Sequence, residues 1–227
     1  MQPSSDLTAK EAANCALNAY LVKDYEEVLA QVDRAIRLNP NDALLWQIQA
    51  ESYHNLGLYE AALHSYNQTL SIDPEQAVAW YFKAVLLAQY FHQYSAALIA
   101  FERSLELDSE DWQAWHNYGM CLMFLNQLDE AIEAFDRAIQ LEPSPDPWYR
   151  KAEALVQQHQ LEQAVYAYEQ AIELEPDCGE FWYQRGLALV DLHQYAEARQ
   201  SYDRAVALEP SYRYVFYNCK ACYTTAS

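Results

Sequence analysis

The segments WHNYGMCL (residues 115–122) and AIEAFDRA (residues 131–138) decide the fold. In the first segment, apolar and small residues recur every three or four positions, which places Trp115 and Gly119 on one face of a helix. The second segment has the same spacing and sets one large ring, Phe135, among small alanines. Because the large ring would face small side chains, two antiparallel helices can approach closely. The sequence therefore predicts a tightly packed helix pair.

This helix-pair pattern recurs along the chain. Tryptophans stand at 46, 80, 115, 148 and 182, and alanines at 62, 97, 131, 164 and 198 are each followed four residues later by an aromatic. Prolines at 40, 74, 143, 176 and 210 end the units, because proline cannot continue a helix. One pair cannot bury its own apolar faces, whereas stacked pairs share a continuous core. We therefore expect an all-α protein of stacked helix pairs.

These positions resemble the signature of the tetratricopeptide repeat, a helix–turn–helix unit. The resemblance covers about residues 9–212 and implies a right-handed α-solenoid of antiparallel helix pairs. The repeats are then 9–42, 43–76, 77–111, 112–144, 145–178 and 179–212. The first repeat is degenerate, since Ala12 replaces the tryptophan. Residues 1–8 are an N-terminal segment in this interpretation, and residues 213–227 form a C-terminal capping helix and tail.

The turn between the two helices of a pair has its own pattern. Gly57 occupies this turn in the second repeat, and Asn126, His159 and His193 take the same position in later repeats. Asparagine and histidine tolerate left-handed backbone better than most other residues. His92 lies in the corresponding turn of the third repeat, which has one extra residue. We therefore interpret these histidines as turn residues.

The proline-rich stretch EPSPDPW (residues 142–148) interrupts the middle of the chain. It is too short for a flexible linker, and the repeat pattern continues through it, so we interpret it as a stiff joint between two repeats. Pro143 is expected to end one helix. Asp146 is predicted to cap the next helix, with Pro147 at its first position.

Composition excludes several classes of protein. The net charge of −19 is spread over all six repeats and would repel nucleic acid. No apolar run approaches the roughly 18 residues needed to span a bilayer, and the N-terminus lacks the pattern of a cleavable signal. Five scattered cysteines do not make a disulfide framework. The sequence therefore predicts a soluble, reduced, cytoplasmic protein that binds no nucleic acid and does not enter membranes.

The sequence offers little catalytic chemistry. It contains no motif of a nucleophile elbow, a phosphate loop or a zinc protease, so we expect no enzyme and no cofactor. Cys219 and Cys222 form one metal-like pair, but a structural zinc site needs four ligands and no second pair exists. His116 has no carboxylate or thiol placed to orient it, which indicates a hydrogen-bonding residue. We predict no metal site.

The family resemblance implies a concave groove, lined by the first helix of each pair, that holds an extended peptide or a partner helix. The residues assigned to this groove are Val78, Tyr81, Phe82, Val85, His116, Asn117, Met120, Met123, Phe124, Tyr149, Arg150, Tyr183 and Gln184. They are rich in aromatics and methionine, with Arg150 as a single cation. Exposed apolar surface of this kind is typical of interaction sites. The alternative is that the chain's own side chains or its terminus fill the groove.

The leading hypothesis is a non-catalytic scaffold or adaptor that binds a protein or peptide. The alternative is a regulatory or substrate-recruiting part of an enzyme or larger assembly whose catalytic domain lies elsewhere. The aromatic C-terminal end adds a second hypothesis, since a solubilising cap should be polar. It assigns self-association, for example a homodimer, or contact with a further segment, to Tyr214, Phe216, Tyr217 and Tyr223.

Overall fold

The computed structural model describes residues 23–213, which form eleven α-helices, one short 3-10 helix and no strand. The helices are α2 (Tyr25–Leu38), α3 (Ala43–Asn55), α4 (Tyr59–Ile72), α5 (Ala77–Gln89), α6 (Tyr94–Leu107), α7 (Trp112–Phe124), α8 (Leu128–Leu141), α9 (Pro145–Gln157), α10 (Leu161–Leu174), α11 (Gly179–Asp191), α12 (Tyr195–Leu208) and η1 (Pro210–Tyr212). The predicted all-α fold is confirmed.

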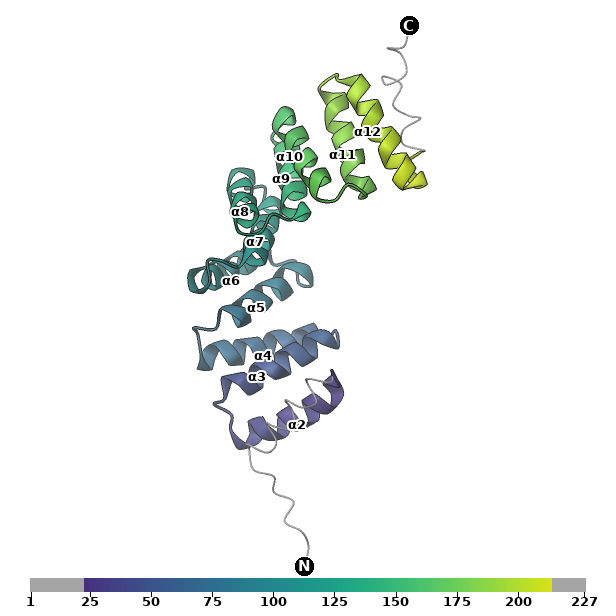
Figure 1. Ribbon diagram of the computed structural model, residues 1–227. Coiled ribbons are helices and arrows are strands. Elements are labelled where there is room, and N and C mark those ends of the chain that lie inside the picture. Colours follow the sequence, from purple (N-terminus) through teal and green to yellow (C-terminus); the bar gives the residue numbers. More distant parts are fainter. Residues whose placement is uncertain (1–22, 214–227) are drawn as a thin grey trace, which may run out of the picture. The chain divides into compact units, whose positions relative to one another are not determined.

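The chain divides into two compact units, residues 1–109 and residues 110–227. In the described part of the first unit, α3 packs against α4 and α5 against α6, while α2 packs on α3. In the second unit the pairs are α7 with α8, α9 with α10 and α11 with α12, and Figure 1 shows the paired helices as neighbours. The first helices begin at residues 43, 77, 112, 145 and 179, where the sequence repeats begin.

The turns within the pairs have the backbone that their residues predicted. The φ angle is 74° at Gly57, 54° at His92, 59° at Asn126 and His159, and 60° at His193. Lys23, before α2, also has a left-handed φ of 60°, which the sequence analysis did not predict. A left-handed residue at each turn reverses the chain, so the second helix can run back along the first.

Close approach within each pair depends on a small residue facing a large ring. A methyl group built on Gly119 would lie only 2.7 Å from Cε1 of Phe135, and one built on Gly186 would lie 2.7 Å from Cε1 of Tyr202. The rings that recur in the second helices are almost fully buried: Tyr66, Phe101, Phe135, Tyr168 and Tyr202. The core therefore repeats from pair to pair, as the spacing of large and small residues predicted.

The repeated tryptophans also have a polar function. The indole Nε1 groups of Trp46, Trp80 and Trp182 donate to the carbonyl oxygens of the prolines six residues earlier, at 2.8–2.9 Å. Each bond ties the start of a first helix to the end of the preceding second helix. Trp148, whose proline lies five residues earlier, makes no such bond within residues 110–213. The six-residue spacing from proline to tryptophan therefore allows this hydrogen bond, in addition to marking where one helix ends and the next begins.

The proline-rich joint differs from its prediction in one respect. Helix α9 begins at Pro145 with Ser144 before it, so Asp146 and Pro147 already lie in its first turn. The predictions of Asp146 as the cap and Pro147 as the first helical residue were wrong. The fixed φ of Pro145 suits a first helical position, and this starts the helix earlier. Asp146 still favours the helix start, because a negative charge complements the helix dipole there.

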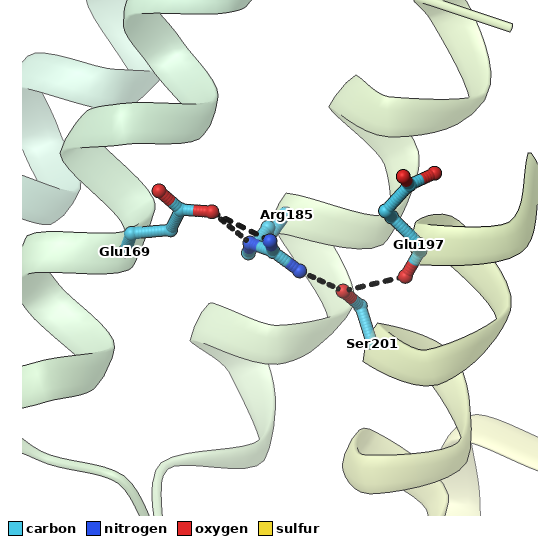
Figure 2. Close-up of polar contacts among 4 residues, drawn as sticks. All are labelled: Glu169, Arg185, Glu197 and Ser201. Carbon is cyan, nitrogen blue, oxygen red and sulfur yellow. Dashed lines mark hydrogen bonds and ion pairs between the residues drawn. The ribbon is translucent and has the colours of Figure 1, made fainter. Parts of the chain in front are cut away.

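Polar contacts join successive pairs as well. In the second unit, Arg185 of α11 reaches between α10 and α12 (Figure 2). Its Nη2 donates to Oε1 of Glu169 at 2.5 Å, and its Nη1 donates to Oγ of Ser201 at 2.6 Å. Ser201 in turn donates to the backbone carbonyl of Glu197. One first-helix side chain therefore holds both neighbouring second helices.

The first unit builds the same contact from different residues. Gln49 of α3 donates to Oδ1 of Asp33 in α2 at 2.6 Å and accepts from Oγ of Ser65 in α4 at 2.7 Å. Each partner lies sixteen residues away from Gln49, as Glu169 and Ser201 do from Arg185. We call this arrangement the three-helix clamp. It fixes how one pair sits on the next within a unit.

Several predictions lie outside the described residues. They include the first helix of repeat 9–42, the C-terminal capping helix, the Cys219–Cys222 pair and the self-association surface at Tyr214, Phe216, Tyr217 and Tyr223. Tyr212, near the end of the described residues, lies in η1 and donates a hydrogen bond to Glu180 of α11.

Candidate functional site

In the first unit, the predicted groove residues lie on α5. The side chain of Val78 is 51% exposed, and Tyr81 and Phe82 are partly exposed. Val85 is only 8% exposed and belongs to the core, so it gives a partner almost no surface. Val85 is buried together with its neighbours Ala84 and Leu86 on the same turn of α5.

Phe82 lines a cavity of about 310 Å³ in the first unit. We call it the aromatic pocket. Its walls come from the last turns of α3, from α4 and from α5: Glu51, His54, Asn55, Tyr66, Phe82 and Tyr90. Only Phe82 was assigned to the groove from the sequence. Glu51 stands five residues after Trp46, as the predicted groove residues Val85 and Met120 stand five after their tryptophans, whereas no repeated pattern marks His54 or Tyr90.

The aromatic rings that line this pocket contact one another and the neighbouring ring of Tyr59. His54 lies 6.0 Å from Phe82 and 6.1 Å from Tyr90 between ring centroids, edge to face in both cases. The rings of Tyr66 and Phe82 are nearly parallel, 6.0 Å apart. Tyr59 stacks on Tyr90 at 3.5 Å. Burial lowers the pKa of His54, although the nearby Glu51 raises it in part, so the imidazole is neutral at pH 7.

In the second unit, five predicted groove residues lie on α7. Phe124 is 61% exposed, and Met120 and Met123 are partly exposed on the same last turns. Asn117 donates to the carbonyl oxygen of Gln113 at 3.0 Å, within its own helix. The end of α7 therefore presents an apolar strip made of Met120, Met123 and Phe124.

His116 is packed more deeply than a groove residue. Its ring lies 5.8 Å from that of Phe135, and its buried Nδ1 has no hydrogen-bond partner among residues 23–213. Burial lowers the pKa of His116; Asp146 opposes this effect and Arg150 adds to it. The predicted hydrogen-bonding role was therefore wrong for Nδ1, because the ring packs against the aromatic core of its pair.

On α9, the two predicted groove residues have other partners. Tyr149 is only 8% exposed, with its ring 5.0 Å from Phe181 and 5.8 Å from Tyr168. Burial raises the pKa of Tyr149, so its hydroxyl stays protonated. Arg150 makes an ion pair of 2.7 Å with Glu153. The predicted aromatic contact is thus a core residue, and the predicted single cation is paired with a carboxylate.

The carboxylate of Glu180 in α11 accepts hydrogen bonds from three side chains of the second unit. Its Oε1 accepts from Tyr149 Oη at 3.3 Å and from Gln184 Nε2 at 2.7 Å, and its Oε2 accepts from Tyr212 Oη at 2.5 Å. The ring of Tyr183 stacks on that of Tyr212 at 4.8 Å. The chain's own Tyr212 therefore stacks on Tyr183. Tyr212 and Gln184 both donate hydrogen bonds to the carboxylate of Glu180. At α11, the two predicted groove residues Tyr183 and Gln184 therefore contact residues of the chain itself.

The described residues show few features of a catalytic or metal site. Burial raises the pKa of the Cys121 thiol to about 12, which leaves almost no thiolate at neutral pH. Between residues 23 and 213, no group of three or more His, Cys, Asp and Glu side chains is arranged to hold a metal ion. In the same range, no helix is both long and apolar enough to cross a membrane.

Stacked helix pairs with a tryptophan, a facing small residue and a terminal proline define a helical repeat protein. Family models for the tetratricopeptide repeat match residues 43–76 and 149–213. A third model, for subunit 3 of the anaphase-promoting complex or cyclosome, matches residues 91–171. The chain belongs to the tetratricopeptide-repeat family.

Solved structures share this fold at low sequence identity. YrrB, described as a TPR protein with an unusual peptide-binding site, is 21% identical with a TM-score of 0.73, and the match covers 82% of this chain and 96% of YrrB. PilW, a type IV pilus biogenesis factor, is 19% identical with a TM-score of 0.71, covering 98% and 100%. MamA from Desulfovibrio magneticus RS-1 is 24% identical with a TM-score of 0.70, covering 75% and 96%. Comparison with curated protein sequences gives no match.

Proposed function

We propose that the protein is a non-catalytic interaction module that binds a peptide or a partner helix on the first helices of its pairs. The observation that carries this proposal is the apolar strip of α7, where Phe124 exposes 61% of its side chain beside two methionines. Exposed aromatic and methionine side chains are enriched where proteins meet, because they supply large and adaptable contact area. The peptide-binding site described for YrrB supports the proposal by similarity of fold.

The position of the strip suits a binding role. In the second unit, Tyr212 already covers the surface of α11 at Tyr183. At the end of α7 most of the Phe124 side chain is exposed, so a partner would contact the second unit there. Arg150 and Glu153 neutralise each other on the neighbouring α9. We infer that apolar contact, rather than charge, anchors the partner on this strip.

Affinity capture from the source cells tests this proposal. The control is Leu174→Ala, which removes a side chain 45% exposed at the end of a second helix in the same unit. We expect Phe124→Ala to lose proteins that the unaltered chain and Leu174→Ala both retain. Equal capture by all three chains, each shown to be folded by circular dichroism, would contradict the proposal.

A further inference from the structure

We infer that the aromatic pocket of the first unit binds the basic side chain of a lysine or arginine presented by a protein partner. The inference rests on the proposed function, since it names the chemistry of one contact that an interaction module would make. It is carried by three features of the first unit: the ring walls, the carboxylate of Glu51 and the local excess of acidic residues.

The ring walls suit a cation. The accessible rings of Phe82, Tyr90 and His54 line a cavity of about 310 Å³, and the buried ring of Tyr66 is stacked on that of Phe82. A cation within about 6 Å of an aromatic ring is attracted to the negative face of that ring. The volume accommodates one side chain but not a helix. The apolar stem of lysine or arginine would contact the rings, while its charged end would lie beside the accessible rings of Phe82, Tyr90 and His54.

Glu51 adds a charge of the opposite sign. It is the one carboxylate among the pocket's lining residues, and its Oε1 accepts from Gln47 Nε2 at 2.8 Å. A carboxylate has about four acceptor sites on its two oxygens, so it can bind several donors at once. A charge-assisted hydrogen bond to Glu51 would distinguish a basic side chain from an apolar one of the same length.

The charges around the pocket favour the same ligand. Residues 23–109 contain twelve Asp and Glu against five Lys and Arg, within a chain of net charge −19. Such an excess attracts cations over a distance of about 8–10 Å at physiological ionic strength. His54 adds no opposing positive charge to the pocket, because burial lowers its pKa and favours the neutral imidazole.

The contacts of the pocket also explain why it stays formed. Tyr90 is fixed by stacking on Tyr59, and Phe82 is held between Tyr66 and the edge of Tyr81. Asn55 donates to the backbone carbonyl of Glu51 at 2.7 Å, which closes the last turn of α3. A site formed before binding loses little conformational entropy when a side chain enters.

Titration of the full chain with small amino-acid probes tests the inference. The probes are the N-acetyl N-methylamides of lysine, arginine and norleucine, and the readout is the NMR shift of the His54 and Tyr90 ring resonances. We expect the lysine and arginine probes to bind at least fivefold more tightly than norleucine. Norleucine binding as tightly as lysine would overturn the inference, and so would the absence of a shift with every probe, as expected if the chain fills the pocket itself.

Two variants make the test specific. Glu51→Gln keeps the shape of the pocket and should weaken the lysine probe about threefold or more without changing norleucine. Its matched control is Glu60→Gln, which removes an exposed carboxylate of α4 that does not line the pocket. Equal affinities in the two variants would contradict the role of Glu51. Because these probes need no natural partner, the test can fail or succeed independently of the capture experiment on Phe124.

Discussion

Arg185 and Glu169 lie sixteen residues apart and join two successive helix pairs, with Nη2 and Oε1 separated by 2.5 Å. The side chain of Arg185 is only 16% exposed, and its Nη1 also donates a hydrogen bond to Oγ of Ser201. Gln49, Asp33 and Ser65 form the same clamp in the first unit. Stability within each unit should therefore depend on one polar side chain at this position.

Arg185→Met should destabilise the second unit by about 1–2 kcal/mol, because hydrogen bonds to a partly buried charged group are lost while the stem is kept. Urea unfolding followed by circular dichroism measures the change. The control is Arg199→Met, whose exposed pair with Asp203 spans 3.9 Å and should contribute less than about 0.5 kcal/mol. Equal losses in the two variants would show that the clamp adds nothing beyond a surface ion pair.

Gly119→Ala should destabilise the protein by about 1–3 kcal/mol, because the new methyl group would lie 2.7 Å from the Phe135 ring. The sign of the change in stability is informative. Helix propensity alone would make Gly119→Ala stabilising by about 1 kcal/mol, so a loss of stability indicates the steric contact. Thermal unfolding measures the effect. Adding Phe135→Leu should recover part of the loss caused by Gly119→Ala. A rise in the unfolding temperature of the single variant would rule out the close contact.

Asn67→Asp should stabilise the first unit by about 0.5 kcal/mol, because it supplies a carboxylate near Lys83. Both residues line one cavity with Trp80, over which the Lys83 Nζ lies at 4.8 Å. Burial lowers the pKa of Lys83, and within residues 23–109 no carboxylate forms an ion pair with it. At the equivalent site of the second unit, Lys151 lies over Trp148 and pairs with Asp136 at 2.5 Å. Chemical denaturation at low salt provides the comparison, with Asn67→Ser as the uncharged control.

Acid should weaken the second unit through His116. Because burial lowers the pKa of His116 in the folded protein, the unfolded chain takes up the proton first as the pH falls below about 6.5. The stabilising effect of the neutral ring is complete above that pH and is lost as the pH falls through the folded pKa. His116→Asn should flatten this part of the pH profile of stability, measured between pH 7 and pH 5. An unchanged slope would assign the pH dependence to other groups.

The repeating features were predictable from the sequence because each depends on residues close together in one pair. The spacing of Trp115, Gly119 and Phe135 predicted both helices and their contact, and the left-handed turns followed from Gly57 and Asn126. These contacts recur with a fixed period, so five copies reinforce one another.

The site was harder to predict because its surfaces depend on contacts between pairs. Tyr149 has the position of a groove residue, but Phe181 of the next pair covers its ring. Tyr212 follows the last predicted second helix, and only the folded chain brings it to Glu180. Tyr90, the residue directly after α5, lines the aromatic pocket, but no repeated sequence position marks it.

Photocrosslinking at the apolar strip tests the central claim most directly. A photoreactive phenylalanine analogue replaces Met123 in one chain and Leu174 in a control chain, and both are irradiated in the source cells. The account predicts that the residue at position 123 forms a covalent adduct with a second protein, that position 174 does not, and that Phe124→Ala abolishes the adduct. Adducts of equal yield and identity from both positions would contradict an interaction surface on the first helices.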